Sequence, residues 1–214
     1  MLMWWGLCGW TLLGAACGVG GSAVIRRFSN TRPPTRRHGS TGPLAVGTAL
    51  LFGLLAWRVG VRPELLAYSA LVAVGMPLAV IDWRERRLPT ALLLPAYPVH
   101  VLLLGLAALV SDDLTSFLRA VSGMVVLFSG YLAVALCARG GLGAGDVRLA
   151  GLLGLVMGWA GWPVLLTGTV LGLVFATVQG AVLILLRGAS PQSAMPLGPA
   201  LLAGAVTVLL MAGA

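Results

Sequence analysis

The chain has only six acidic side chains in 214 residues, and two of them lie where chemistry is possible. Asp82 closes an apolar stretch and is followed by the basic segment WRERRLP. Asp146 follows the glycine-rich segment GGLGAG, in which the missing Cβ atoms let the backbone bend sharply and approach a neighbour closely. The acids expected to be solvated, in loops or at helix edges, are Glu64, Asp112 and Asp113.

Two carboxyl groups brought within a few ångströms of each other cannot both ionise cheaply, so such a pair shares one proton. The pair can then hold a water molecule between a general base and a general acid. The ionised carboxylate takes a proton from the water, which attacks a peptide carbonyl, while the protonated acid polarises that carbonyl. Asp82 and Asp146 are therefore a candidate pair for aspartic proteolysis.

Each of these two acids also has a purely structural interpretation. An aspartate at the start of a helix commonly caps free backbone N–H groups, and this is the alternative for Asp146. Asp82 could instead form an ion pair with Arg84, Arg86 or Arg148 at the membrane interface. Taken one at a time, the residues leave both interpretations open.

No other set of reactive side chains competes with this pair. The sequence contains neither GxSxG nor HExxH, and no potential partners are arranged around its two histidines, His38 and His100. Three cysteines lie in apolar stretches without a CxxC pair, which indicates neither a zinc site nor a disulfide framework. We therefore expect no metal and no cofactor. These cysteines are Cys8, Cys17 and Cys137.

The composition is that of a membrane protein. Hydrophobic residues make up 59% of the chain and charged residues 9%, whereas about a quarter of a soluble domain is charged. Apolar runs long enough to cross a ~30 Å hydrocarbon core recur from one end to the other. We expect a single all-α transmembrane domain over residues 1–214, a polytopic bundle of about eight membrane-spanning helices. The expected spans are 3–25, 43–58, 64–81, 91–110, 117–137, 147–160, 163–186 and 197–213.

The arginines predict how these spans are oriented. All 14 basic residues are arginines, and they concentrate in alternate loops, as is typical of cytoplasmic loops. With the loop over residues 26–42 placed in the cytoplasm, only Arg58, Arg62 and Arg119 fall on the opposite side. Both termini are then extracytoplasmic. Both candidate acids then lie at the cytoplasmic face, where a membrane-embedded carboxylate is expected to face the bundle interior or a wet cavity.

Two features of the positively charged residues fit the membrane interpretation. The first apolar stretch has no basic residue before it, whereas Arg26 and Arg27 follow it, the reverse of a secretory signal sequence; we expect it to be the first span. The short basic loop over residues 26–42 is expected to set topology and to rest on anionic lipid headgroups. Because the net charge of +8 is confined to such loops, we expect no nucleic-acid partner.

Three segments, in order, carry a resemblance to a known family. The segment IDWRERRLP (81–89) has an Asp followed seven residues later by Pro. GAGDVRLAGLLG (143–154) contains GxGD with a basic residue two positions on, and AMPLGPALLAG (194–204) contains P-x-G-P-x-L. In these segments the chain resembles the prepilin peptidases, or type IV leader peptidases, among the GxGD aspartyl proteases. The resemblance covers roughly residues 64–204.

This resemblance implies that Asp82 and Asp146 are the catalytic pair of an intramembrane-facing aspartic endopeptidase. It also implies that a group of further residues supports the active site around this pair. That set is Pro89, Gly143, Gly145, Arg148 (usually lysine in the family), Pro196, Gly198 and Pro199. The family's substrates are type IV prepilins and related pseudopilins or Flp-type pilins, cleaved after a short basic leader. The implied location is the bacterial inner membrane, as a multi-pass protein with its active site near the cytoplasmic face.

The loop over residues 26–42 departs from the family pattern. Many members carry a larger cytoplasmic insertion there, with paired CxxC cysteines that bind zinc, and they also N-methylate the trimmed pilin. Here the loop is short and contains no cysteine. We therefore expect no zinc site, and N-methyltransferase activity using S-adenosylmethionine is in doubt.

Three other functions make different predictions. A presenilin-like or signal-peptide-peptidase-like protease shares GxGD, and residues 199–201 spell PAL, but its first Asp is expected after tyrosine and here follows Ile81. A small transporter using the acids as a proton relay would place them near the bilayer midplane, with discontinuous helices or repeat symmetry. The sequence shows no convincing repeat. A scaffold subunit would need neither acid.

Overall fold

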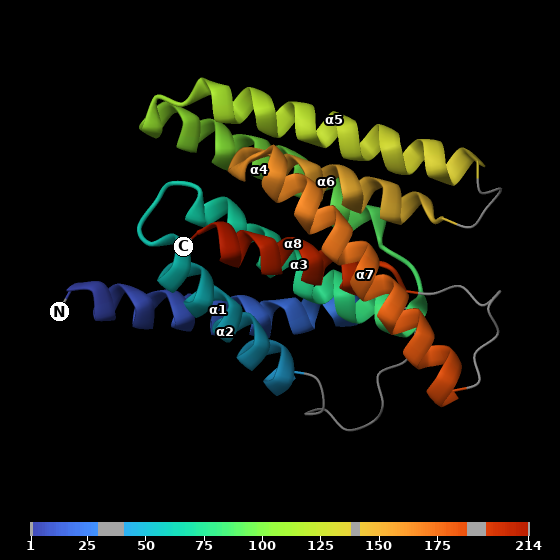
Figure 1. Cartoon of the computed structure of the whole chain (residues 1–214). Helices are drawn as coiled ribbons and strands as arrows, with labels where there is room; N and C mark the ends of the chain where they lie inside the picture. Colours follow the sequence, from blue (N-terminus) through green and yellow to red (C-terminus); the bar gives the residue numbers. More distant parts are fainter. Residues whose placement is uncertain (1, 30–40, 138–141, 188–195, 214) are drawn as a thin grey trace.

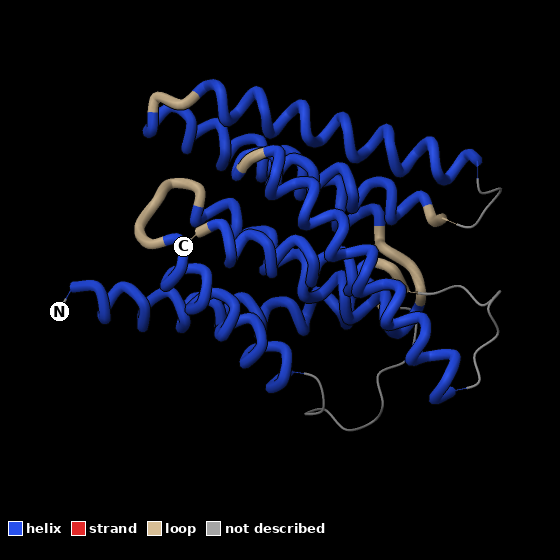
Figure 2. The backbone as a smooth tube through the Cα atoms, viewed as in Figure 1, coloured by secondary structure: helices blue, strands red, loops and turns tan. Residues whose placement is uncertain are grey.

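The computed structural model describes residues 2–29, 41–137, 142–187 and 196–213. These residues form eight α-helices and no strand (Figures 1 and 2), which confirms the all-α prediction. The helices are α1 (Leu2–Phe28), α2 (Thr41–Val59), α3 (Leu65–Glu85), α4 (Thr90–Ser111), α5 (Leu114–Cys137), α6 (Ala144–Ala160), α7 (Trp162–Arg187) and α8 (Gly198–Ala212).

Six of the helices in the described part of the chain are long and apolar enough to cross a membrane: α1, α2, α3, α4, α5 and α7. The other two, α6 and α8, have 17 and 15 residues and rise only about 25 Å and 22 Å. Both are shorter than a ~30 Å hydrocarbon core. The structure is thus a polytopic helical bundle with six candidate spans by length and composition, where we expected about eight.

Each expected span coincides with a helix, but several helices continue past their apolar residues. The helix α1 runs through Arg26 and Arg27 to Phe28, and α2 begins at Thr41, so both helices enter the expected loop over residues 26–42. Arginine is favoured in the last turn of a helix because it faces the negative end of the helix dipole. Residues 30–40, with His38, and the motif residues 140–141 and 194–195 lie outside the described residues.

Glycines let neighbouring helices pack backbone to backbone. A Cβ on Gly154 of α6 would lie 2.3 Å from the carbonyl oxygen of Gly123 on α5, and one on Gly204 of α8 would lie 2.4 Å from the nitrogen of Gly172 on α7. A Cβ on Gly18 of α1 would similarly lie 2.5 Å from a Cα atom of α2. The chain therefore packs as three antiparallel hairpins, α1–α2, α5–α6 and α7–α8, which α3 and α4 connect (Figure 1). Small residues commonly serve this purpose in membranes, where apolar side chains gain little by leaving the lipid.

The short helices lie inside the bundle. In α6, Val147 and every residue from 149 to 159 are buried, and most residues of α8 are buried as well. The outer helices α4 and α7, in contrast, present apolar side chains outward, such as Leu109 and Leu185, each about 80% exposed. An apolar exterior around a packed interior is what a lipid solvent requires.

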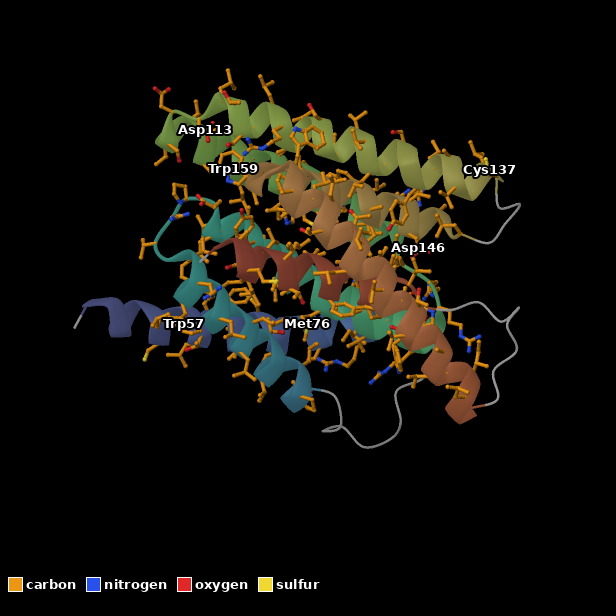
Figure 3. The ribbon with its side chains drawn as sticks, viewed as in Figure 1. Trp57, Met76, Asp113, Cys137, Asp146 and Trp159 are labelled. Atoms are coloured by element: carbon orange, nitrogen blue, oxygen red, sulfur yellow. The ribbon has the colours of Figure 1, made fainter. Side chains whose placement is uncertain are left out.

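The even number of helices returns the chain to the end from which it started. The marked N- and C-termini lie at one end of the bundle (Figure 1). Asp113 and Trp159 lie at that same end, whereas Asp146 and Cys137 lie at the other (Figure 3). The C-terminal end of α3 and the N-terminal ends of α4, α6 and α8 therefore face the end that contains Asp146.

Substitution of Gly154 by alanine is expected to destabilise the α5–α6 hairpin. The added methyl group would overlap the Gly123 carbonyl oxygen, and overpacking of this kind typically costs about 1–3 kcal/mol. The matched control is Gly130→Ala on α5, where an added Cβ has no atom within 4 Å and alanine is the better helix former. Thermal unfolding in detergent measures the difference. Equal melting temperatures for the two variants would contradict the close helix packing.

Candidate active site

Asp82 lies near the C-terminal end of α3 and is 4% exposed. Its Oδ2 atom accepts a hydrogen bond of 2.8 Å from the backbone N–H of Gly198. Gly198 is the first residue of α8, so the acid faces the unpaired N–H groups and the positive dipole end of that helix. Among the described residues, Asp82 forms no ion pair with an arginine, which leaves the ion-pair interpretation without support.

Asp146 is the third residue of α6 and is half-buried. Gly143 is the N-cap residue of this helix, and its carbonyl oxygen accepts a hydrogen bond of 3.0 Å from the backbone N–H of Asp146. The Oδ2 atom lies 3.1 Å from the position that a Cβ on Gly143 would take, so the carboxylate turns back over its own helix terminus. Helix capping therefore accounts for part of the surroundings of Asp146.

The segments that carry the two acids come from different helices but converge on one residue of the α3–α4 link. Leu88, in the link between α3 and α4, lies between the termini of α6 and α8. A Cβ on Gly145 would lie 2.8 Å from the Leu88 Cβ, and one on Gly198 would lie 3.3 Å from the Leu88 Cδ2. Three segments distant in sequence thus converge around the acids.

The close contact of the Asp82 carboxylate with the start of α8 requires a glycine at position 198. A Cβ there would lie 2.9 Å from the Asp82 Oδ2, inside the normal contact distance of a carbon and an oxygen. A larger residue would push the backbone N–H away from the carboxylate that it binds. Gly145 is under the same constraint from Leu88, and both glycines belong to the motifs identified in the sequence.

Arg148 does not pair with either acid but connects α6 to α4. Its Nη1 donates to the Thr90 hydroxyl oxygen at 2.9 Å, and the Tyr97 hydroxyl donates to the Arg148 carbonyl oxygen at 2.5 Å. Thr90 begins α4 directly after Pro89, whose buried ring precedes the helix and whose carbonyl accepts the first helical bonds. Arg148 and Pro89 therefore fix the start of α6 against the start of α4.

The two prolines of the C-terminal segment shape the approach to Gly198. Pro196 is buried, and its carbonyl oxygen accepts a hydrogen bond of 2.5 Å from the Gln179 side chain of α7. Pro199 occupies the first turn of α8, where a missing N–H leaves no helical bond unmade. Together they fix the direction in which the Gly198 N–H points. The structure thus brings all the sequence-predicted residues to one end of the bundle.

Several residues of this site escaped the sequence analysis. Leu88 and Thr90 flank a predicted proline, and that adjacency was the only available signal for them. Tyr97 and Gln179 bind backbone carbonyls of distant segments. Tyr131 of α5 lies near enough to Asp146 to interact with its charge. No local pattern marks these last three, because their partners are defined only by the packing of helices.

The arrangement brings two carboxyl groups from different helices to one end of the bundle, and acid–base chemistry can use such a pair. Within the described residues, no three side chains of His, Cys, Asp or Glu come together as metal ligands. His100 is fully buried in α4, and its Nδ1 lies 2.7 Å from the Ala96 carbonyl oxygen. It belongs to the helix packing and not to the pair of acids.

Comparison with known proteins relates the chain to one family. A model of the type IV leader peptidase family matches residues 65–185, more than half of the chain. The chain is 35% identical over 173 residues to a prepilin leader peptidase/N-methyltransferase of Pseudomonas putida, covering 77% of this chain and 56% of that protein. It is 30% identical over 207 residues to the protein of that name from Stutzerimonas stutzeri, covering 95% and 65%. No solved structure gives a significant match.

These matches cover only part of the candidate site and only part of the related proteins. The family match includes Asp82 and Asp146 but ends before α8, so the Gly198 contact lies beyond it. A third relative, the prepilin leader peptidase/N-methyltransferase of Pseudomonas aeruginosa strain PAO1, is 28% identical over 208 residues. The chain spans between 56% and 65% of the length of these three relatives.

The convergence of segments can be tested by a cross-link. In a variant lacking the native cysteines, Leu88→Cys and Gly145→Cys should form an intramolecular disulfide on mild oxidation. The expected Cβ atoms lie 2.8 Å apart, and a backbone shift of about 1 Å would bring them to disulfide geometry. Mass spectrometry of a protease digest detects the linked peptides. Leu88→Cys with Gly130→Cys is the control that should stay unlinked, and absence of the first link would contradict the site.

Proposed function

Because the chain belongs to the type IV leader peptidase family, we propose that it is an intramembrane-facing aspartic endopeptidase. Its proposed substrates are type IV prepilins, or Flp- or pseudopilin-like precursors, from which it removes the basic leader. The observation that carries this proposal is that the helix ends bearing Asp82 and Asp146 converge around Leu88 at one end of the bundle. The names of the related proteins support the choice of substrate class.

In the proposed reaction the two carboxyl groups act on a water molecule held between them. The ionised carboxylate removes a proton from the water as the water oxygen attacks the carbonyl carbon of the scissile peptide. The protonated acid donates a hydrogen bond to the carbonyl oxygen, and a proton then passes to the leaving amine. We assign these roles to the pair as a unit, because the protons of two coupled acids belong to both.

The proposed orientation places the Asp82–Asp146 end of the bundle at the cytoplasmic face of the bacterial inner membrane. The arginine bias supports it, since Arg26, Arg27 and Arg187 lie at the helix ends on this side. Both termini are then extracytoplasmic. The short helices α6 and α8 complete the eight-helix domain from inside, and anionic headgroups are the proposed neighbours of the arginines.

The position of the acids supports the peptidase over a transporter. A proton relay would place the carboxylates near the bilayer midplane, on interrupted helices. Here Asp146 is in the first turn of α6 and Asp82 in the last turn of α3, so both lie at helix ends. A presenilin-like protease remains the alternative enzyme, and prepilin processing is favoured by the Asp82 to Pro89 spacing and by the relatives.

Substitution of either proposed catalytic acid by asparagine should abolish prepilin cleavage. In Asp82→Asn or Asp146→Asn the amide would keep the side-chain volume but could not exchange a proton. Losing acid–base catalysis typically costs about 10²–10⁴-fold in rate. The assay is cleavage of a co-expressed prepilin, followed by N-terminal sequencing of the product.

The matched control for these variants is Asp112→Asn. Asp112 is exposed and adopts a left-handed conformation that asparagine tolerates well. It directly precedes Asp113, which lies at the other end of the bundle (Figure 3). This variant should cleave at the normal rate. Near-normal cleavage by Asp82→Asn or Asp146→Asn, with the protein folded and inserted, would refute the aspartic mechanism.

The product of the proposed reaction should carry an unmodified N-terminal amine. The related proteins are named for both a peptidase and an N-methyltransferase activity, but we propose only the first for this chain, because residues 26–42 contain no cysteine to bind zinc. Purified enzyme incubated with prepilin and S-adenosylmethionine should yield trimmed, unmethylated pilin by intact-mass analysis. A methylated product would show that the second activity does not need that insertion.

A further inference from the structure

The two short helices begin at the candidate active site and end at the opposite end of the bundle. At that far end, the last carbonyl groups of a helix have no partner within the helix itself. In α6 these groups are bound by Arg119 of α5. Its Nε donates to the Gly158 carbonyl oxygen at 2.9 Å and its Nη2 to the Trp159 carbonyl oxygen at 2.6 Å.

The end of α8 is held in the same way by a different helix. Arg58, the penultimate residue of α2, donates from Nε to the Leu210 carbonyl oxygen at 2.9 Å. The backbone of Arg58 also approaches Gly213, the residue that caps α8. A guanidinium at a helix C-terminus is favoured twice, by its hydrogen bonds and by its charge against the helix dipole.

These two arginines are exceptions to the charge pattern of the chain. Arg58, Arg62 and Arg119 are the three that fall on the side opposite the arginine-rich loops. Basic residues on that side act against the expected topology. The hydrogen bonds of Arg58 and Arg119 provide a physical reason for two of the three exceptions.

Arg119 is itself held in place by a polar cluster. Its Nη2 donates to the Ser116 hydroxyl oxygen at 2.9 Å, and Ser116 donates from its hydroxyl and its backbone N–H to the Asp113 carboxylate. These hydrogen bonds from Ser116 hold the pKa of Asp113 below its usual value, with a smaller contribution from the positive charge of Arg119. The Arg119 guanidinium therefore donates to three acceptors, the Ser116 hydroxyl and the carbonyl groups of Gly158 and Trp159, which limits its movement.

The far ends of α6 and α8 are mechanically connected to the active site. Twelve residues separate Asp146 from Gly158 and Gly198 from Leu210, so each arginine acts about 18 Å along a helix from the site. Both helices pack closely against their neighbours, in part through glycines. A hydrogen-bonded contact at the end of each helix adds a directional restraint on its position along the axis.

We propose that Arg119 and Arg58 are positioning residues, which set the axial depth of α6 and α8 and thereby hold Asp146 and the Gly198 N–H against Asp82. Neither arginine touches the reacting groups. The kinetic part of this inference rests on the proposed peptidase function, whereas the mechanical part does not. Displacements of about 1 Å at a catalytic site commonly reduce rates by about 10²-fold.

The test compares Arg119→Met and Arg58→Met with their lysine counterparts. The methionine variants should lower kcat for prepilin cleavage by about 10- to 100-fold, with KM changed by less than about twofold, because substrate binding is untouched. Arg58→Lys should restore most of the rate, since Arg58 uses one donor on one carbonyl. Arg119→Lys should restore only part of it, because the fork of Arg119 serves three acceptors.

Arg62→Met is the matched control. Arg62 and Arg119 line one cavity beside Asp113 and Trp159, but the Arg62 side chain donates to no helix carbonyl in the described part of the chain. This variant should keep the normal kcat. An equal loss of kcat in Arg62→Met, or a loss in Arg119→Met that lysine does not relieve at all, would overturn the proposal.

A second measurement does not depend on activity. Hydrogen exchange of the folded, detergent-solubilised variants should show faster exchange over residues 142–150 in Arg119→Met and over residues 196–203 in Arg58→Met. Faster exchange confined to the arginine end of each helix would overturn the positioning role. If the exchange effect is transmitted but the unaltered protein cleaves no prepilin, the proposed function fails and the positioning role stands.

Discussion

The structure depends on how a carboxylate is accommodated in the interior of a helical bundle surrounded by lipid. Asp82 is almost completely buried, and a buried acid is costly unless hydrogen bonds replace the water that it loses. Its partner is a backbone N–H at the first residue of α8, which combines a hydrogen bond with the positive end of a helix dipole. The glycine at 198, the prolines on either side of it and the short length of α8 all serve to bring that N–H to the acid.

The same end of the bundle shows a general means of building a polar site inside lipid. Irregular backbone is tolerated at membrane depth only where it is buried in protein or wet. Here the glycine-rich start of α6 and the segment before α8 are covered by Leu88 and bonded by Arg148 and Gln179 to neighbouring elements. The two acids therefore lie at helix N-termini, Asp146 on that of α6 and Asp82 facing that of α8, and the outer helices can remain largely apolar toward the lipid.

The opposite ends of α6 and α8 suggest why these helices can be short. A membrane-spanning helix is held at both interfaces by its flanking residues, whereas a helix shorter than the hydrocarbon core cannot reach both. In this protein the partly exposed Arg119 and Arg58 bind the far ends, so each short helix lies between the candidate active site and a guanidinium group. The geometry of the candidate active site and the length of these helices are connected through these contacts.

The sequence by itself determined that the chain is a membrane protein, where its helices lie and which residues are candidates for the site. Apolar runs located all eight helices of the described residues, because each helix shows in its own composition. The motifs around Asp82, Asp146 and Gly198 predicted the candidate site before any geometry was known. Helix ends were less predictable, since Arg26 and Arg27 continue a helix that hydropathy alone would stop.

Tertiary structure decided what a linear pattern cannot express. It showed that Gly198, and not an arginine, is the partner of Asp82, that Arg148 binds Thr90, and that Arg58 and Arg119 bind the ends of buried helices. These pairings join residues tens of positions apart, and their formation depends on the depth and rotation at which glycine-lined helices pack. Local propensity contains no information on that depth, which is set by contacts between whole helices.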